Sequence, residues 1–316
     1  MKPRKVMIIG TGNVGASAAY ALLNQQIGEE LILVDINQAR LEGQRKDLAD
    51  AAAYMPSRVT VSSRSAADCA DVDIAVITVS GGSLKPGQTR LDELDATAGI
   101  VRQIVPQMMA GGFNGIFLIA TNPCDIITYQ VWKLSGLPRH RVLGTGVWLD
   151  TTRLRRLLAE QLDIAPQSID AFIVGEHGDS QFPVWSHCAV YGMPLEEFSR
   201  GKNGQTLDFA ALAERTRKTG FNIYAQKGCT EYGVAGTIAE ICRNLLTGSH
   251  RALTVSCVLD GEYGQRGLAI GVPAVMSQDG VAQIIELDFT PQERRQFETS
   301  AAVIEQNIRR LAVKHH

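Results

Sequence analysis

A histidine between two glycines is the residue of this chain best suited to moving a proton. His177 lies in the segment Gly175–Asp179, where the neighbouring glycines leave its ring open to a ligand. Imidazole is the side chain whose ordinary pKa lets it donate and accept a proton near neutral pH. Most histidines are structural, however, so a chemical role for His177 depends on the residues that accompany it.

Asp150 and Arg153 lie three residues apart at the start of an expected helix, so both side chains can project from one face of its first turn. An aspartate bound to a histidine fixes its tautomer and stabilises its charged form, and the planar fork of an arginine matches the two oxygens of a carboxylate. The pair therefore indicates acid–base chemistry on a carboxylic acid. On spacing alone, a helix-capping aspartate with an exposed ion-pair partner is an equally good explanation.

Two further segments lie where a substrate would be handled. Lys85–Arg90 follows the glycines of Ser80–Ser83 and has the features of a lid that carries Arg90 inward; the alternative is a solvent-exposed basic loop. Asn122 lies at the carboxyl end of an expected strand, the edge at which open α/β sheets bind ligands. Its alternative is a turn-forming Asn-Pro pair.

A G-x-G-x-x-G motif between an expected strand and an expected helix predicts a dinucleotide site. Its first glycine permits a tight turn, its second lets the backbone approach a pyrophosphate, and its third lets helix and strand pack closely. Free N–H groups at the start of the helix favour the negative pyrophosphate. A plain structural turn is the alternative. The residues expected to bind the cofactor here are Gly10, Gly12, Asn13, Val14 and Gly15.

Asp35 ends the next expected strand, twenty residues after Gly15. A carboxylate there accepts hydrogen bonds from the ribose hydroxyls and repels a 2′-phosphate, so NAD is favoured over NADP. Arg40 lies near enough to leave some use of NADP open. The alternative for Asp35 is a cap of the following helix or a surface aspartate.

The first half of the chain alternates β-branched strands with helical stretches, which predicts a doubly wound parallel sheet of the Rossmann type. The expected strands are Lys5–Ile9, Leu31–Val34, Val59–Ser62, Ile74–Val79 and Ile116–Ala120, and the expected helices are Val14–Gln25, Ala39–Tyr54, Glu93–Met109 and one that ends at Ser135.

The second half predicts an α+β substrate domain with antiparallel strands, because turns such as Asp260-Gly261 and Asp279-Gly280 join its strands. We expect two domains, 1–144 for the cofactor and 145–316 for the substrate. The last helix should bury Phe297, Ala301, Ile304, Ile308 and Leu311 and turn Glu305, Arg309 and Arg310 to solvent. The strands expected in this second half of the chain are Ala171–Val174, Leu253–Leu259, Leu268–Val275 and Gln283–Glu286.

Composition narrows the class of protein. The chain has 316 residues, 45% of them hydrophobic, and 31 basic against 33 acidic residues. No basic surface indicates nucleic acid or an anionic membrane, and no apolar run approaches the roughly 18 residues of a membrane span. The six scattered cysteines predict reduced thiols and a cytoplasmic location, and no cluster predicts a metal site.

Together these segments resemble the L-lactate/malate dehydrogenase family over essentially the whole chain. The segments that carry the resemblance are Gly10–Gly15, Asp35, Asp68–Asp73, Lys85–Arg90, Thr121–Pro123, Leu149–Arg153, Gly175–Asp179 and Gly271–Ala274.

The resemblance implies an NAD enzyme that forms a homotetramer or a homodimer and has its active site between the two domains. His177 would be the catalytic acid and base, with Asp150 as its partner. Arg153 would bind the substrate carboxylate and Arg90 would polarise the substrate carbonyl. Asn122 would lie near the nicotinamide and the reacting oxygen. The expected activity is that of an NAD-dependent L-2-hydroxyacid dehydrogenase of the L-lactate dehydrogenase type.

The substrate side chain is expected to be apolar. Leu84 occupies the position at which lactate enzymes of the family commonly have glutamine and malate enzymes have arginine. A second carboxylate against this leucine would be buried without a partner, which disfavours malate dehydrogenation. Thr230 and Val234, across the pocket in the family pattern, suit pyruvate or a bulkier acid such as 2-oxoisocaproate.

The sequence leaves two alternative functions open besides malate dehydrogenation. A glycosidase on a related NAD-binding scaffold would need metal-ligand Cys/His pairs and would leave Arg153 and Arg90 unexplained. A catalytically silent NAD-binding protein would be expected to lack His177, Asp150 or Arg90, and all three are present.

A second difference from the family pattern concerns regulation by a bound effector. Many bacterial members bind fructose bisphosphate through an arginine and a histidine at a subunit interface. Arg155 matches the arginine position, but Asp170 occupies that of the histidine. A carboxylate repels a phosphate, so we expect no activation by fructose bisphosphate.

Overall fold

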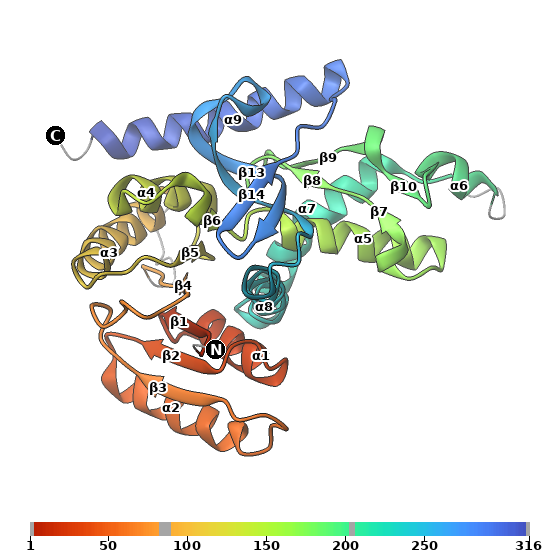
Figure 1. Ribbon diagram of the computed structural model, residues 1–316. Helices are drawn as coiled ribbons and strands as arrows, with labels where there is room; N and C mark the ends of the chain where they lie inside the picture. The colour runs from red at the N-terminus through yellow and green to blue at the C-terminus, as the bar shows by residue number, and fades with distance from the viewer. Residues whose placement is uncertain (1–2, 82–89, 202–205, 314–316) are drawn as a thin grey trace.

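A nine-stranded mixed sheet forms the centre of the molecule, in the order β14-β13-β12-β6-β5-β4-β1-β2-β3 (Figure 1). The computed structural model describes residues 3–81, 90–201 and 206–313. Six of the strands pair in parallel, which confirms the predicted Rossmann-type sheet. They are β1 (Lys5–Ile9), β2 (Glu30–Val34), β3 (Thr60–Ser63), β4 (Ile74–Ile77), β5 (Ile116–Ile119) and β6 (Val142–Gly144).

Helices connect and cover these parallel strands. The pair α1 and α2 packs together on the sheet, and α3 packs against α4. Strands β4 and β5 are buried along their whole length, as expected of short β-branched runs with helices on both faces. The helices are α1 (Asn13–Asn24), α2 (Gln38–Ala52), α3 (Arg90–Ala110) and α4 (Cys124–Ser135).

Three antiparallel strands continue the same sheet instead of forming a separate one. β12 (Ala252–Asp260) pairs antiparallel with β6, β13 (Arg266–Ser277) with β12, and β14 (Gly280–Ile284) with β13. The predicted antiparallel pairing is therefore confirmed. The last strand lies earlier than the predicted Gln283–Glu286, because it begins directly after the turn at Asp279.

The remaining strands are very short. One small sheet joins β7 (Ile169–Asp170), β10 (Ala189–Val190) and β11 (Met193–Pro194), and another joins β8 (Ile173–Val174) to β9 (Phe182–Pro183). The predicted strand Ala171–Val174 is thus only partly a strand. Short one-turn helices lie at Arg139–Arg141, Pro166–Ser168, Trp185–His187 and Glu262–Gly264.

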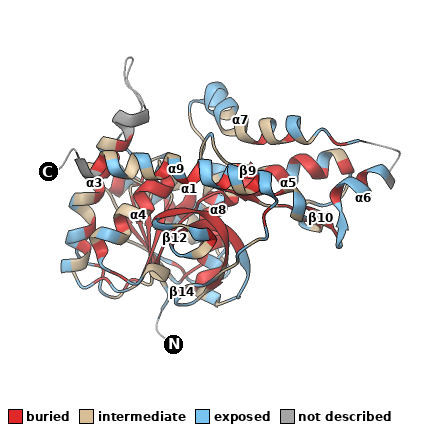
Figure 2. Cartoon of the chain, turned by 90° about the horizontal axis from the view of Figure 1, so that it is seen from above, coloured by how far each residue is buried: buried red, intermediate tan, exposed pale blue. Residues whose placement is uncertain are grey.

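Five helices belong to the second half of the chain. The start of α5 (Trp148–Leu162) and most of α9 (Pro291–Val313) agree with the predicted helices, whereas the other three helices were not predicted. α8 packs on α1, and α7 packs on α5 (Figure 2). The unassigned helices are α6 (Leu195–Gly201), α7 (Phe209–Lys227) and α8 (Tyr232–Thr247).

The apolar face of α9 is buried as predicted: Phe297, Ala301, Ile304 and Leu311 lie in the core and Ile308 packs against it. Arg309 is exposed and Glu305 pairs with it. Arg310 was wrongly expected to face solvent. Its guanidinium lies 3.2 Å from Asp95 of α3, so an ion pair joins this end of α9 to α3.

Candidate active site

The turn from β1 into α1 has the geometry that a dinucleotide site requires. Gly10 has a φ of +98°, a region that favours glycine. A Cβ at Gly15 would lie 1.9 Å from the carbonyl oxygen of Gly10, so only glycine lets helix and strand approach this closely. A Cβ at Gly12 would meet no atom within 4 Å, so this residue borders open space. The space lies at the N-terminus of α1, where Asn13 and Val14 begin the helix.

Asp35 lies beside this turn and not at a helix cap. Its Oδ2 accepts hydrogen bonds from the Thr11 amide at 2.7 Å and the Thr11 hydroxyl at 2.8 Å, and its Oδ1 accepts from the Asn37 amide. Asn37, not Asp35, caps α2. Burial raises the pKa of Asp35, but these hydrogen bonds outweigh it and hold the pKa below the ordinary value. An ionised carboxylate is therefore fixed beside the glycine-rich turn.

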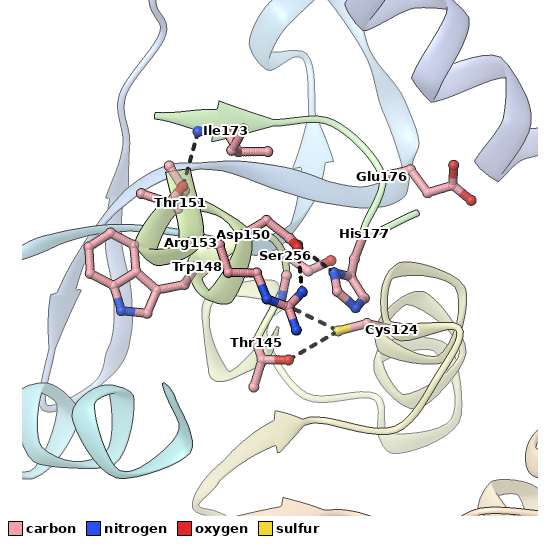
Figure 3. Close-up of polar contacts among 12 residues, drawn as sticks. Cys124, Thr145, Trp148, Asp150, Thr151, Arg153, Ile173, Glu176, His177 and Ser256 are labelled. Atoms are coloured by element: carbon pink, nitrogen blue, oxygen red, sulfur yellow. Dashed lines mark hydrogen bonds and ion pairs between the residues drawn. The ribbon is translucent and has the colours of Figure 1, made fainter. Parts of the chain in front are cut away.

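His177, Asp150 and Arg153 meet around one buried carboxylate (Figure 3). The His177 Nδ1 lies 2.7 Å from Asp150 Oδ2, and the Arg153 Nη1 lies 3.0 Å from Asp150 Oδ1. Asp150 is 2% exposed, whereas 26% of the His177 side chain is exposed. The aspartate is thus hidden behind an imidazole that a ligand can reach. Since Nδ1 faces Asp150, Nε2 is the nitrogen left for a substrate.

The buried charge of Asp150 is stabilised by His177 and Arg153, and Asp150 in turn stabilises the charged form of His177. Burial lowers the pKa of His177, but the carboxylates of Asp150 and Asp125 together raise it more, and the net pKa lies above the ordinary value. Burial likewise raises the pKa of Asp150, and His177 with Arg153 more than compensates, so its pKa is lowered. The raised pKa of His177 favours an imidazolium–carboxylate pair, which can act as an acid towards a bound ligand.

Polar contacts to other elements hold α5 and the His177 segment in place. The Thr151 hydroxyl accepts a hydrogen bond from the Ile173 amide of β8 and lies 2.8 Å from the Thr254 hydroxyl of β12. Just beyond β8, Gly175 and Gly271 form a backbone bridge with N···O distances of 2.9 and 3.0 Å. The loop that carries His177 therefore starts from a fixed point.

Other predicted site residues are placed less completely. Asn122 is exposed and follows β5 at the carboxyl edge of the sheet, directly before α4. Thr230 is half-buried in the loop between α7 and α8. Arg90 is the first residue of α3, and Leu84 with the rest of the predicted lid lies outside the described residues.

Sequence reasoning missed three residues that support this site. Asp125 of α4 accepts a hydrogen bond from the His177 amide, and Ser256 of β12 donates to the same carboxylate. Gly220 of α7 faces the guanidinium of Arg153, since a Cβ there would lie 3.3 Å from Nη1. Asp125 follows Asn122 by three residues, so its position beside a predicted ligand-binding segment was the one available signal.

The arginine considered for effector binding is bound within its own chain. Arg155 donates to the carbonyl of Ala171 at 3.0 Å and its guanidinium lies over the rings of Trp148 and Phe172. Asp170 is exposed beside it, on β7.

We expect fructose bisphosphate at millimolar concentration to change the KM for a 2-oxo acid by less than about twofold, because the Asp170 carboxylate opposes a phosphate. Initial rates with and without the effector measure this. A large fall in KM would contradict the expectation.

The described part of the chain, 3–81, 90–201 and 206–313, contains no helix long and apolar enough to cross a membrane. The same residues bring no three His, Cys, Asp or Glu side chains together as a metal site. All six cysteines are free thiols.

The fold and the site define a dehydrogenase class. Residues 4–144 match the model of the lactate/malate dehydrogenase NAD-binding domain, and residues 148–314 match that of the lactate/malate dehydrogenase alpha/beta C-terminal domain. The chain therefore belongs to the lactate/malate dehydrogenase family and is an NAD-dependent oxidoreductase.

Individual relatives of the chain have more specific names than the family. The chain is 71% identical over 311 residues to "L-lactate dehydrogenase 2" of Listeria innocua, covering 98% of this chain and 100% of that protein. It is 47% identical over 303 residues to "L-lactate dehydrogenase 3" of Bacillus cereus, covering 95% and 96%. The ligand-bound crystal structure of the minor L-lactate dehydrogenase from Enterococcus mundtii superposes with a TM-score of 0.93 at 41% identity, covering 98% of each chain.

Proposed function

We propose that this protein interconverts a 2-oxo acid that has an apolar side chain with the corresponding L-2-hydroxy acid, using NAD as the hydride carrier. The observation that carries the proposal is the buried carboxylate of Asp150, which binds an accessible imidazole through one oxygen and a guanidinium through the other. This arrangement suits a substrate that has a carboxylate next to a reacting carbonyl. The L-lactate dehydrogenases among its relatives support the same class of substrate.

Each site residue receives a role that follows from its chemistry. His177 donates a proton from Nε2 to the substrate oxygen during reduction and accepts it back during oxidation. Asp150 fixes the tautomer through Nδ1 and stabilises the imidazolium. Arg153 holds the substrate carboxylate with the guanidinium donors that Asp150 leaves free. Two roles rest on the sequence alone: Arg90 would polarise the carbonyl, and Leu84 would contact the substrate side chain.

The open space at Gly12 and the fixed carboxylate of Asp35 fit NAD. The N–H groups at the start of α1, at Asn13 and Val14, would hold its pyrophosphate, and Asp35 its adenosine ribose. Asn122 would lie near the nicotinamide, and Thr230 across the substrate pocket. When bound, the reduced cofactor supplies a hydride to the carbonyl carbon.

We further propose that 1–144 and 145–316 act as cofactor and substrate domains, that the chain works as a homo-oligomer, dimer or tetramer, in the cytoplasm, and that its partners are small molecules. The break between the two matched family models, at 145–147, supports the division.

The function is tested by following NADH absorbance at 340 nm with pyruvate, 2-oxoisocaproate, phenylpyruvate and oxaloacetate in turn, with NADPH as a parallel cofactor. We expect turnover with at least one apolar acid, little with oxaloacetate, and slower reaction with NADPH. Preference for oxaloacetate would indicate a malate dehydrogenase. Absence of turnover with all four acids, despite NADH binding, would indicate a catalytically silent NAD-binding protein.

The pH dependence should have opposite signs in the two directions. Reduction needs the imidazolium of His177, so its kcat/KM should fall as pH rises through the His177 pKa. Oxidation needs the neutral ring, so its kcat/KM should rise over a similar range. Because the His177 pKa is raised, both changes should centre above the ordinary value of about 6.5. Profiles between pH 5 and 9 in both directions measure this, and limbs of the same sign would contradict it.

A further inference from the structure

A second buried carboxylate lies behind the proposed acid–base group, and the proposed mechanism does not use it. Asp125 is the second residue of α4 and is only 2% exposed. Its Oδ2 accepts a hydrogen bond from the backbone amide of His177 at 2.8 Å, and its Oδ1 accepts one from the Ser256 hydroxyl at 2.6 Å. The carboxylate therefore joins the start of α4, the His177 loop and β12 at one point.

No Lys or Arg contacts Asp125 in the ion pairs found among the described residues. Burial raises the pKa of Asp125 and the hydrogen bonds from Ser256 and His177 and the charge of His177 lower it, and the net pKa is raised to about 6. The influence is mutual, since the Asp125 charge raises the pKa of His177. The imidazolium is thus the cation on which ionised Asp125 depends.

We propose that Asp125 is a positioning residue: its two hydrogen bonds fix the His177 loop, and its negative charge, added to that of Asp150, helps to keep His177 protonated. The inference rests on the proposed function, because it assigns Asp125 to the acid–base step of that reaction. Asp125 acts through His177 and has no contact with substrate in this account.

The charge matters because an uncharged acceptor would be enough to hold a backbone amide. A buried carboxylate is unfavourable unless a nearby positive charge or several donors stabilise it, and two donors serve Asp125 here. Ionised Asp125 and protonated His177 therefore favour each other.

Other charged groups also face this pair. Asp150 of α5 raises the pKa of His177, and Arg153 of the same helix lowers it. Glu176 raises the pKa of Asp125, although its side chain points away from His177 (Figure 3). Burial raises the pKa of the adjacent Cys124 thiol to about 12, so this group stays neutral. Burial raises the pKa of the Cys257 thiol as well. The experiment must therefore change Asp125 alone.

Asp125→Asn removes the charge and keeps the shape. The amide oxygen can still accept from the His177 N–H, and the amide nitrogen can donate to the Ser256 hydroxyl. We expect the His177 pKa to fall by about one unit, which corresponds to a tenfold loss of kcat/KM for reduction at alkaline pH. Well below that pKa, kcat/KM should stay within about threefold of the unchanged protein.

The direct measurement is an NMR titration of the imidazole in the full-length protein labelled at histidine, with His177→Gln to assign the signal. This readout needs no turnover. If no 2-oxo acid is reduced, the proposed function fails while the titration still tests the link between Asp125 and His177.

Two further variants make the test specific. Glu293→Gln removes another buried carboxylate, one that accepts hydrogen bonds from Ser186 and Thr290, and it should leave the His177 pKa unchanged. Ser256→Ala removes one donor from Asp125, favours its protonated form, and should lower the His177 pKa in the same direction but less.

The outcomes separate clearly. A lower His177 pKa in Asp125→Asn and Ser256→Ala, with none in Glu293→Gln, supports the proposal. An unchanged His177 pKa in Asp125→Asn overturns it, as does a loss of kcat/KM that is equal at every pH, because a purely structural role gives that pattern. If Asp125→Asn does not fold, Ser256→Ala decides by the same criteria.

Discussion

Replacing His177 by asparagine should lower kcat for 2-oxo acid reduction by roughly 10³- to 10⁴-fold, the upper part of the range for a lost general acid. The imidazole is the accessible member of the Asp150 cluster, and its raised pKa favours the charged form that delivers a proton. An asparagine amide can hydrogen-bond to Asp150 but has no proton to give. The steady-state rate of NADH oxidation at saturating substrate measures the effect.

The control for this variant is another histidine. His250 is exposed and has a φ of +53°, a region that asparagine tolerates well, so His250→Asn should leave kcat unchanged within about twofold. NADH binding, followed by its fluorescence, should be the same in His177→Asn as in the unchanged protein. A kcat within tenfold of the unchanged protein would remove His177 from the acid–base role.

The parts of the fold that sequence patterns predicted are those that short segments determine by themselves. The turn at Gly10–Gly15 needs glycine for reasons that lie within a few residues, namely a positive φ and the approach of Gly15 to Gly10. Alternation of strands and helices predicts a parallel sheet for the same local reason. Continuation of that sheet through β12 depends on pairing between Ser256 and Gly144, which no local pattern indicates.

The candidate site shows the same division. His177, Asp150 and Arg153 could be selected from residue type and from the family resemblance. Spacing could not show that His177 meets Asp150, because 26 residues lie between them along the chain although their side chains are in contact. Asp125 and Gly220 were missed since their importance lies in contacts with His177 and Arg153 from other elements. A lone aspartate two residues into α4 resembles an ordinary helix-dipole partner until its burial is known.

Replacing Arg153 by lysine should reduce kcat/KM for a 2-oxo acid by about 10²- to 10³-fold, which corresponds to roughly 3 to 4 kcal/mol and reflects the loss of the bidentate hydrogen bonds to the carboxylate. The Arg153 side chain is 12% exposed, its Nη1 binds Asp150, and the absence of a side chain at Gly220 leaves room beside the guanidinium. Lysine keeps the charge but has no planar fork, so it cannot hold Asp150 and a substrate carboxylate together in the same geometry.

Most of this loss should be seen as a higher KM, because the carboxylate is bound in the ground state as well as in the transition state. Arg156, three residues further along α5, forms a surface ion pair with Glu160, and Arg156→Ala should change kcat/KM by less than about twofold. The His177 pKa provides an internal check. Because the positive charge of Arg153 lowers this pKa and lysine retains that charge, the His177 pKa should be unchanged in Arg153→Lys. A fall in kcat with KM unchanged would show that Arg153 acts on the reacting carbonyl and not on the carboxylate.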